Sequence, residues 1–281
     1  MFVNENSWEE VKKKLTIIIP VYNSEKTILK CITYLLPLAE KGVQILISDN
    51  FSDDSTREIL KKFNDSRNIK ITYQQSNIGG ESMLRLVKSV KTKYLLPIGS
   101  DDYLIDHANI PNTIKRLEDH SNAVACCFKS SFIYKQGYIF DRANIELAGT
   151  KEKRFTKFLR NVGANSRYYG IIRSDLFLKY YPRKSYFGDD VALSAKILSV
   201  GDWLYDEKII LHRERGISSD PFKLRRALGY TFLPPMRFAK EIIEYSSSKL
   251  SIIFWFSFFL YILKILIGPI KHIIITKKYE Q

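Results

Sequence analysis

The 281-residue chain has only three cysteines, Cys31, Cys126 and Cys127, and none forms a CxxC pair. This number and spacing exclude a disulfide framework, so we expect a reducing environment with all three side chains in the core. The chain also lacks the GxGxxG and GxxxxGK[ST] patterns, which excludes the common dinucleotide and P-loop phosphate sites. Acids and Trp8 stand where a signal peptide needs an apolar segment, so we expect no secretion signal.

Negative charge is scarce: 44 Lys and Arg face 30 Asp and Glu, a net charge of +14. This balance indicates a phosphorylated substrate, an anionic membrane or nucleic acid as a partner. Half of the excess lies in residues 221–281, which hold ten Lys or Arg and three Glu.

The same tail contains a long apolar run, LSIIFWFSFFLYILKILIGPIKHIII, at residues 250–275. Its length is enough to span a bilayer, although Lys264 interrupts it near the middle. We expect membrane association, with a spanning and an in-plane orientation both open. The alternative is a pair of buried helices within a soluble fold. The run is too apolar for a nucleic-acid arm.

Short β-branched runs alternate with amphipathic segments in the first hundred residues, a pattern typical of a mostly parallel α/β sheet. Ser24 is expected to cap the first of these helices, and Ser55 and Glu58 stand at capping-box spacing for the second. The expected strands are 15–23, 43–49, 68–74 and 93–98, and the expected helices are 24–42, 53–63 and 77–91.

Carboxylates and amides follow each of these strands, and the carboxyl ends of strands are where an open α/β sheet binds ligands. Like charges brought together raise one another's pKa, and a divalent cation held with a phosphate would offset that cost. Taken singly, each segment is also compatible with a turn or a helix cap. The residues in question are Asp49, Asn50, Asp53, Asn77, Asp101 and Asp102.

The order of four segments, LTIIIPVYNSEKTILKCITYLL, QILISDNFSDDST, SNIGG and KYLLPIGSDDYL, resembles the family 2 glycosyltransferases. The resemblance covers about residues 14–215. It implies a GT-A fold, in which a Rossmann-like, mostly parallel sheet is flanked by helices. We expect a glycosyltransferase domain at 1–225 and a basic, hydrophobic, helical membrane-associating region at 226–281.

The resemblance also assigns roles to the acidic rim. Asp101 would be the metal ligand with Asp102 beside it, because Gly99 stands where the family often has the first Asp of its metal motif. His212 would lie near the metal or the diphosphate. The residues that would contact or frame the nucleotide are Pro20, Val21, Tyr22, Asn23, Asp49, Asn50, Asp53, Asn77 and Asp101.

A second acidic doublet, Asp189 and Asp190 in YFGDDVALS, resembles the acidic motif that precedes a helix in this family. Asp190 would then be the general base that takes the acceptor proton in an inverting transfer. A helix cap is the simpler alternative. The resemblance also places Tyr169, Gly170 and Arg173 near the substrate.

The sequence therefore predicts an inverting glycosyltransferase for cell-surface glycan biosynthesis. It would use Mg²⁺ or Mn²⁺, a nucleotide-sugar donor and a lipid-linked or polysaccharide acceptor, at the cytoplasmic face of the cell membrane, without nucleic acid. The alternatives are a nucleotidyltransferase on a related sheet, a catalytically degenerate GT-A protein that binds nucleotide-sugars, and a non-enzymatic basic binding module.

Overall fold

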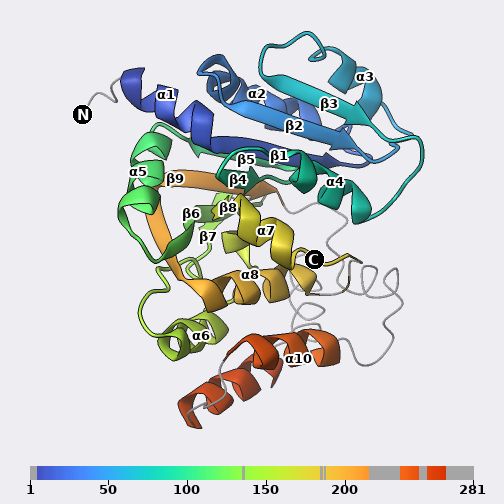
Figure 1. Cartoon of the computed structure of the whole chain (residues 1–281). Coiled ribbons are helices and arrows are strands. Elements are labelled where there is room, and N and C mark those ends of the chain that lie inside the picture. Colours follow the sequence, from blue (N-terminus) through green and yellow to red (C-terminus); the bar gives the residue numbers. More distant parts are fainter. Residues whose placement is uncertain are drawn as a thin grey trace.

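A computed structural model describes residues 5–134, 137–183, 186, 188–214, 235–246 and 252–263. Its centre is a nine-stranded sheet in the order β3-β2-β1-β4-β8-β6-β9-β5, with β7 paired to β6 (Figure 1). The strands are β1 (Leu15–Val21), β2 (Gln44–Asp49), β3 (Ile69–Tyr73), β4 (Tyr94–Pro97), β5 (Asp102–Asp106), β6 (Ala123–Tyr134), β7 (Gly137–Phe140), β8 (Ile171–Arg173) and β9 (Asp202–Glu214). The helices are α1 (Glu5–Lys14), α2 (Ile28–Glu40), α3 (Thr56–Lys61), α4 (Glu81–Ser89), α5 (Ile110–Asp119), α6 (Lys151–Arg160), η1 (Ser166–Tyr169), α7 (Ser174–Tyr180), α8 (Asp189–Val200) and α10 (Pro235–Ser246).

Alternation along the strands builds two hydrophobic cores, one on each face of the sheet. Ile17 and Ile19 of β1 pack with α1, α2, α3 and α5, whereas Ile18 packs with α4, α6, α7 and α8. Successive side chains of a strand point to opposite faces, and the central strands are buried on both. This explains why they read as continuous apolar runs.

The predicted mostly parallel sheet is confirmed for β3, β2, β1 and β4, which pair in parallel. It is wrong for the rest, because the sheet is mixed. β8 pairs antiparallel with both β4 and β6, and β5 pairs antiparallel with β9, while β6 and β9 are parallel. The return of the chain through β8 and β9 brings its second half beside the end of β4, which no local pattern of apolar residues specifies.

The four expected early strands and three expected early helices are confirmed, but the two predicted caps are not. α2 begins only at Ile28, and the Ser24 hydroxyl instead bonds to the Ser100 hydroxyl at 2.7 Å. Ser55 makes no side-chain cap bond at α3; its backbone N–H donates to Glu25 Oε2. Both serines tie the loops at the strand ends together, and for Ser24 the hydroxyl used in this way is the group that a cap would need.

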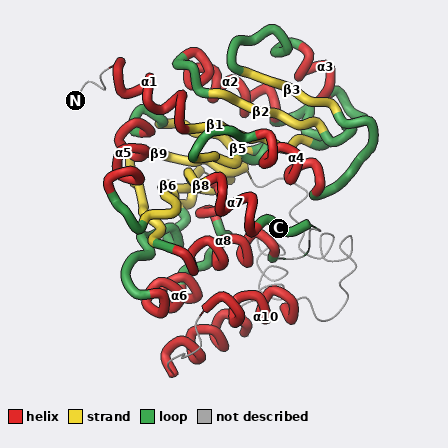
Figure 2. The backbone as a smooth tube through the Cα atoms, in the orientation of Figure 1, coloured by secondary structure: helices red, strands yellow, loops and turns green. Residues whose placement is uncertain are grey.

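Two helices near the end of the described chain pack on the hydrophobic core that contains Ile18, α6 and α8. α10 lies against α8, and the helix at residues 252–263, red in Figure 1, lies beside α10 (Figure 2). Ile242, Phe254, Phe258 and Tyr261 are buried in the same core as α6 and α8. Among the described residues, no helix is long and apolar enough to cross a membrane. The rest of the predicted 250–275 run and residues 264–281 lie outside the described residues, and the domain boundary at 225/226 stays a prediction.

We predict that Phe254→Ala will lower the free energy of unfolding by about 3 kcal/mol, because the side chain is fully buried beside Phe155 and Phe258. Phe256→Ala on the same helix is the control, since that side chain is 57% exposed and its loss should cost little. Thermal unfolding of the full chain in detergent checks this. Equal shifts in melting temperature for the two variants would contradict the packing.

Candidate active site

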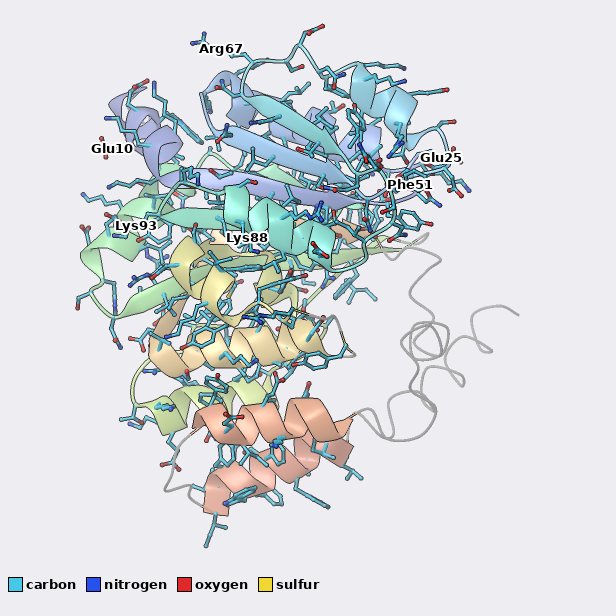
Figure 3. All side chains as sticks on the ribbon, turned by 45° about the vertical axis from the view of Figure 1, so that its right-hand side comes forward. Glu10, Glu25, Phe51, Arg67, Lys88 and Lys93 are labelled. Carbon is cyan, nitrogen blue, oxygen red and sulfur yellow. The ribbon has the colours of Figure 1, made fainter. Side chains whose placement is uncertain are left out.

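A cleft of about 300 Å³ opens at the carboxyl ends of β1 and β4. In Figure 3 this end of the sheet carries the labelled Phe51 and Glu25, on the side opposite Lys93 and Glu10. Four of the residues predicted to contact the nucleotide line the cleft, namely Pro20, Val21, Tyr22 and Asn50. The other lining residues are Gly79, Gly80, Ser82, Met83, Pro97, Ile98, Gly99, Tyr168, Tyr169 and Tyr181.

Asp49, one of the residues predicted to contact or frame the nucleotide, is fully buried at the end of β2 and forms a close ion pair with Arg57. Arg57 Nε lies 2.6 Å from Asp49 Oδ2, and its NH2 group donates to the Gln74 carbonyl. The Ser52 backbone N–H donates to the same carboxylate. Three successive elements are thereby fixed around one buried charge. The sequence offers no sign of this pair, because Arg57 reads as an ordinary helix residue.

The predicted Asn50 and Asn77 are brought together and shape the loop that follows β3. Asn50 Nδ2 donates to Asn77 Oδ1 at 2.9 Å, and Asn50 Oδ1 accepts from the Ile78 backbone N–H. Asn23, in the left-handed region at φ 46°, accepts from the Asp53 backbone N–H through its Oδ1. These amides hold the loops around the cleft, and whether they also contact a nucleotide stays a prediction.

Gly99, Ser100 and Asp101 form a tight turn from β4 into β5, closed by the Asp102 N–H donating to the Gly99 carbonyl. A Cβ built on Gly99 would lie 2.8 Å from Asp101 Oδ1 and 2.9 Å from Asp102 Oδ2. The two carboxylates therefore converge on the space that a side chain at position 99 would take. This accounts for glycine at the place where the resemblance leads one to expect Asp.

Burial makes both of these carboxyls weaker acids. Burial raises the pKa of Asp101. It raises the pKa of Asp102 to about 7, with the charge of Asp101 adding to the rise and Arg213 opposing it. A divalent cation bound to the two carboxylates would lower both pKa values, because it favours the charged form of each group.

His212, the third predicted metal ligand, is not brought together with the aspartates. It is adjacent to Arg213 on β9, and neighbouring residues of a strand point to opposite faces. Asp102 stands opposite Arg213 and Tyr103 stands opposite His212. The imidazole bonds to the Ser131 hydroxyl at 2.9 Å and stacks on Tyr103. Burial, reinforced by Lys30, lowers its pKa.

The second doublet begins α8, as predicted. Asp190 Oδ2 accepts a 2.9 Å hydrogen bond from Asn165 Nδ2, and Asp189 Oδ2 accepts from the Tyr186 backbone N–H. Asp189 therefore bonds back to the segment just before its own helix, whereas Asp190 is held by a residue from another segment. Asn165 is buried in a left-handed conformation at φ 52°, and no motif in the sequence marked it.

Arg213 links the two doublets. Its Nε lies 3.6 Å from Asp102 Oδ2, and its NH1 donates to the Ala164 carbonyl and to the Ser166 hydroxyl. Its guanidinium also lies over the Tyr169 ring, 4.5 Å from the centroid. Residues 164–166 include Asn165, which holds Asp190. Arg213 therefore pairs with Asp102 directly and is connected to Asp190 through this segment.

The charges around Arg213 raise the pKa of its guanidinium. Burial alone would lower the pKa of the guanidinium. Tyr169, Asp102, Asp190 and Asp101 together raise it. The carboxylates of both doublets thus lie within electrostatic range of one buried cation.

Asp101 and Asp102 fit a metal ion that is held mainly by the phosphate oxygens of its substrate. The described part of the chain holds no cluster of three or more His, Cys, Asp or Glu that could bind an ion. Asp101 and Asp102 do offer two converging carboxylates, and Mg²⁺ is commonly held by one or two carboxylates together with phosphate oxygens. The donor set therefore suits a cation that arrives with a diphosphate.

The fold and site define an α/β protein with a cleft and two acidic doublets at the carboxyl ends of its strands. The sequence model of Glycosyl transferase family 2 matches residues 16–180, which is more than half of the chain. The chain belongs to this family, as its motifs predicted.

Similar proteins support the same placement. The poly(ribitol-phosphate) beta-N-acetylglucosaminyltransferase TarS of Staphylococcus aureus is 29% identical over 115 residues, 40% of this chain and 20% of TarS. The Escherichia coli protein WfaP, a UDP-Glc:alpha-D-GlcNAc-diphosphoundecaprenol beta-1,3-glucosyltransferase, is 33% identical over 106 residues, 37% of this chain and 41% of WfaP. The chain thus aligns with about a fifth of TarS and two fifths of WfaP.

Solved structures show the same fold. S. aureus TarS 1–349 in complex with UDP-GlcNAc superposes with a TM-score of 0.61 at 17% identity, over 83% of this chain and 65% of that one. The mannosyltransferase PcManGT of Pyrobaculum calidifontis, in complex with GDP-Man and Mn²⁺, gives a TM-score of 0.57 at 13% identity, over 86% and 66%. The predicted GT-A-like arrangement of a sheet flanked by helices is confirmed.

We predict that the metal-free protein loses stability as pH rises from about 4 to 7. Asp102 has a pKa of about 7 when folded and near 4 when unfolded. Across this window the native state binds more protons, so the free energy of unfolding falls with pH. Asp102→Asn removes this contribution and should flatten the dependence in urea unfolding at pH 5 and pH 8. An unchanged slope in that variant would contradict the assignment.

Proposed function

We propose that this protein is an inverting glycosyltransferase that moves a sugar from a nucleotide-diphosphate donor to a hydroxyl of a glycan acceptor. The observation that carries the proposal is the pair of acidic doublets joined by Arg213 beside a cleft at the strand ends. Inversion needs a base on the acceptor side and charge stabilisation on the leaving-group side. Two separate acidic groups supply these two needs.

The roles follow from the contacts. Tyr22 and its neighbours at the end of β1 would face the base and ribose in the cleft. Asp101, with Asp102 beside it, would hold Mg²⁺ or Mn²⁺, which when bound neutralises charge on the departing diphosphate. Asp190, oriented by Asn165, would take the proton of the attacking hydroxyl. His212 faces Ser131 and Tyr103, so we do not include it among the metal ligands of the proposed mechanism.

The relatives indicate the substrate class. The names of these relatives specify a ribitol-phosphate polymer and a glycan linked to diphosphoundecaprenol. A bacterial cell-wall or lipid-linked glycan acceptor is therefore the class that we propose here. Family membership disfavours the nucleotidyltransferase and the non-enzymatic module. A degenerate fold is disfavoured because both carboxylate doublets are present, and burial raises the pKa of both carboxyls of the first one, Asp101 and Asp102.

We predict that Asp190→Asn lowers the transfer rate by roughly 100- to 10,000-fold while leaving nucleotide binding largely intact, since it removes only the base. Asp101→Ala should also weaken metal-dependent nucleotide binding. Asp175→Asn is the control, because that carboxylate is exposed on α7 and pairs with Arg173. Sugar transfer and calorimetric titration with the nucleotide measure the two effects. Wild-type transfer in both site variants would refute the assignment.

We also propose that the C-terminal region rests on the cytoplasmic face of the cell membrane. The helix at 252–263 buries one face and leaves the other apolar and exposed; Ile252 is 87% and Phe259 63% exposed. α6, whose Arg160 bonds to Ser257 of this helix, presents exposed Lys153 and Lys157. An apolar face flanked by cations is the pattern of a helix that lies in the plane of an anionic membrane.

Substituting Phe256 and Phe259 together with Ser should weaken binding to vesicles that contain phosphatidylglycerol by at least about tenfold, because both side chains lose their apolar burial. Leu178→Ser is the control, since Leu178 is 40% exposed on α7, away from this helix. Vesicle co-sedimentation gives the measurement. Unchanged binding of the double variant would refute this membrane surface.

A further inference from the structure

A second cavity, of about 420 Å³, lies beside the proposed base and is separate from the nucleotide cleft. It sits between the turn after β7, the end of α6 and the helix at 252–263. Its lining residues are Arg142, Ala143, Leu159, Arg160, Asn161, Val162, Gly163 and Tyr261. Residues 159–163 of its lining continue along the chain into Asn165, which holds Asp190. The wall of the cavity is thus joined to the residue that orients the proposed base.

A buried cation without an ion-pair partner among the described residues stands behind the wall of this cavity. Arg167 is fully buried, and its NH2 donates to the carbonyls of Ala143 and Asn161, which are both lining residues. Its guanidinium lies over the Phe158 ring, and its Nε and NH1 have no hydrogen-bond partner among the described residues. Burial lowers the pKa of this guanidinium, and the charge of Asp141 only partly opposes the shift. A buried charge without an ion pair is costly, and an anion nearby would offset that cost.

Two further arginines surround the opening. Arg142 and Arg160 are exposed lining residues, and Arg160 donates its Nε to Ser257. The nearest acid, Asp141, accepts from the Ala143 backbone N–H and from the Ser166 hydroxyl, so both of its oxygens are engaged. Two guanidiniums thus line the cavity and a third lies behind its wall, while the neighbouring Asp141 carboxylate is held by two hydrogen bonds.

We propose that this cavity, here named the arginine pocket, binds a phosphate group of the acceptor. Arg142 and Arg160 hold the phosphate at the opening, while Arg167 supplies positive potential from behind. Guanidinium groups match phosphate oxygens in geometry and charge. The phosphate belongs either to a soluble polyol-phosphate chain or to a lipid-linked acceptor, and Tyr261 connects the pocket to the helix with the exposed apolar face. The assignment to the acceptor rests on the proposed function; phosphate binding itself does not.

The test uses the full chain and compares Arg142→Ala/Arg160→Ala with Lys61→Ala/Lys62→Ala. The control pair removes the same charge from exposed residues at the end of α3, which do not line the pocket. The probes are sn-glycerol 3-phosphate, glycerol, and a long-chain polyprenyl phosphate in detergent micelles, titrated calorimetrically. The arginine variant should lose at least about tenfold in phosphate affinity, since each pair of charge-assisted hydrogen bonds is worth this much. The lysine variant should stay within about twofold of the wild type, and glycerol should not bind.

The outcomes distinguish the two sources of the phosphate, and they separate the arginine pocket from the nucleotide site. Arginine-dependent binding of both phosphates supports a headgroup site, and arginine-dependent binding of the micellar compound alone supports a lipid-linked acceptor. No phosphate binding, or equal losses in the two variants, would overturn the proposal. UDP is titrated in the same preparations. Its binding should be equal in all of them, so failure of the arginine pocket is distinguishable from failure of the nucleotide site.

Discussion

One cation, Arg213, is the constraint on which the rest of the site depends. It pairs with Asp102 on one side and bonds on the other to the segment that carries Asn165, the partner of Asp190. Without it, Asp102 would lose its ion pair at a position where burial already raises its pKa, and unpaired buried charges are expensive. The mixed part of the sheet sets this geometry, because the antiparallel pairing of β5 with β9 puts Arg213 opposite Asp102.

The first half of the chain could be predicted from its sequence because its signals are local. β-branched runs, helical spacing and polar residues at strand ends specify parallel βα units, and Pro20 and Asn50 indeed line one cleft. The sheet beyond β4 was missed because its antiparallel pairings join segments far apart in the chain. His212 was misplaced for a related reason: a one-residue alternation on β9 decides which face a side chain takes, and only the register with β5 settles it.

The buried ionic contacts were also beyond the sequence. Arg57 and Arg167 look like ordinary surface residues in the sequence, yet one pairs with Asp49 and the other is enclosed without an ion-pair partner among the described residues. The charge of Asp49 is thereby satisfied within the protein, whereas Asp101 and Asp102 keep raised pKa values and Arg167 keeps two unbonded nitrogens. These are the two places where a bound cation and a bound anion would lower the cost of burying charge.

We place Asp101 and Asp190 on the two sides of one proposed reaction centre. A crystal structure with UDP and Mn²⁺ would test this placement, because manganese is located by its anomalous scattering. We expect a manganese peak next to the Asp101 carboxylate, with the diphosphate bound to the metal and the nucleoside in the cleft beside Tyr22. A peak away from Asp101 and Asp102, or a nucleotide bound elsewhere on the chain, would contradict it.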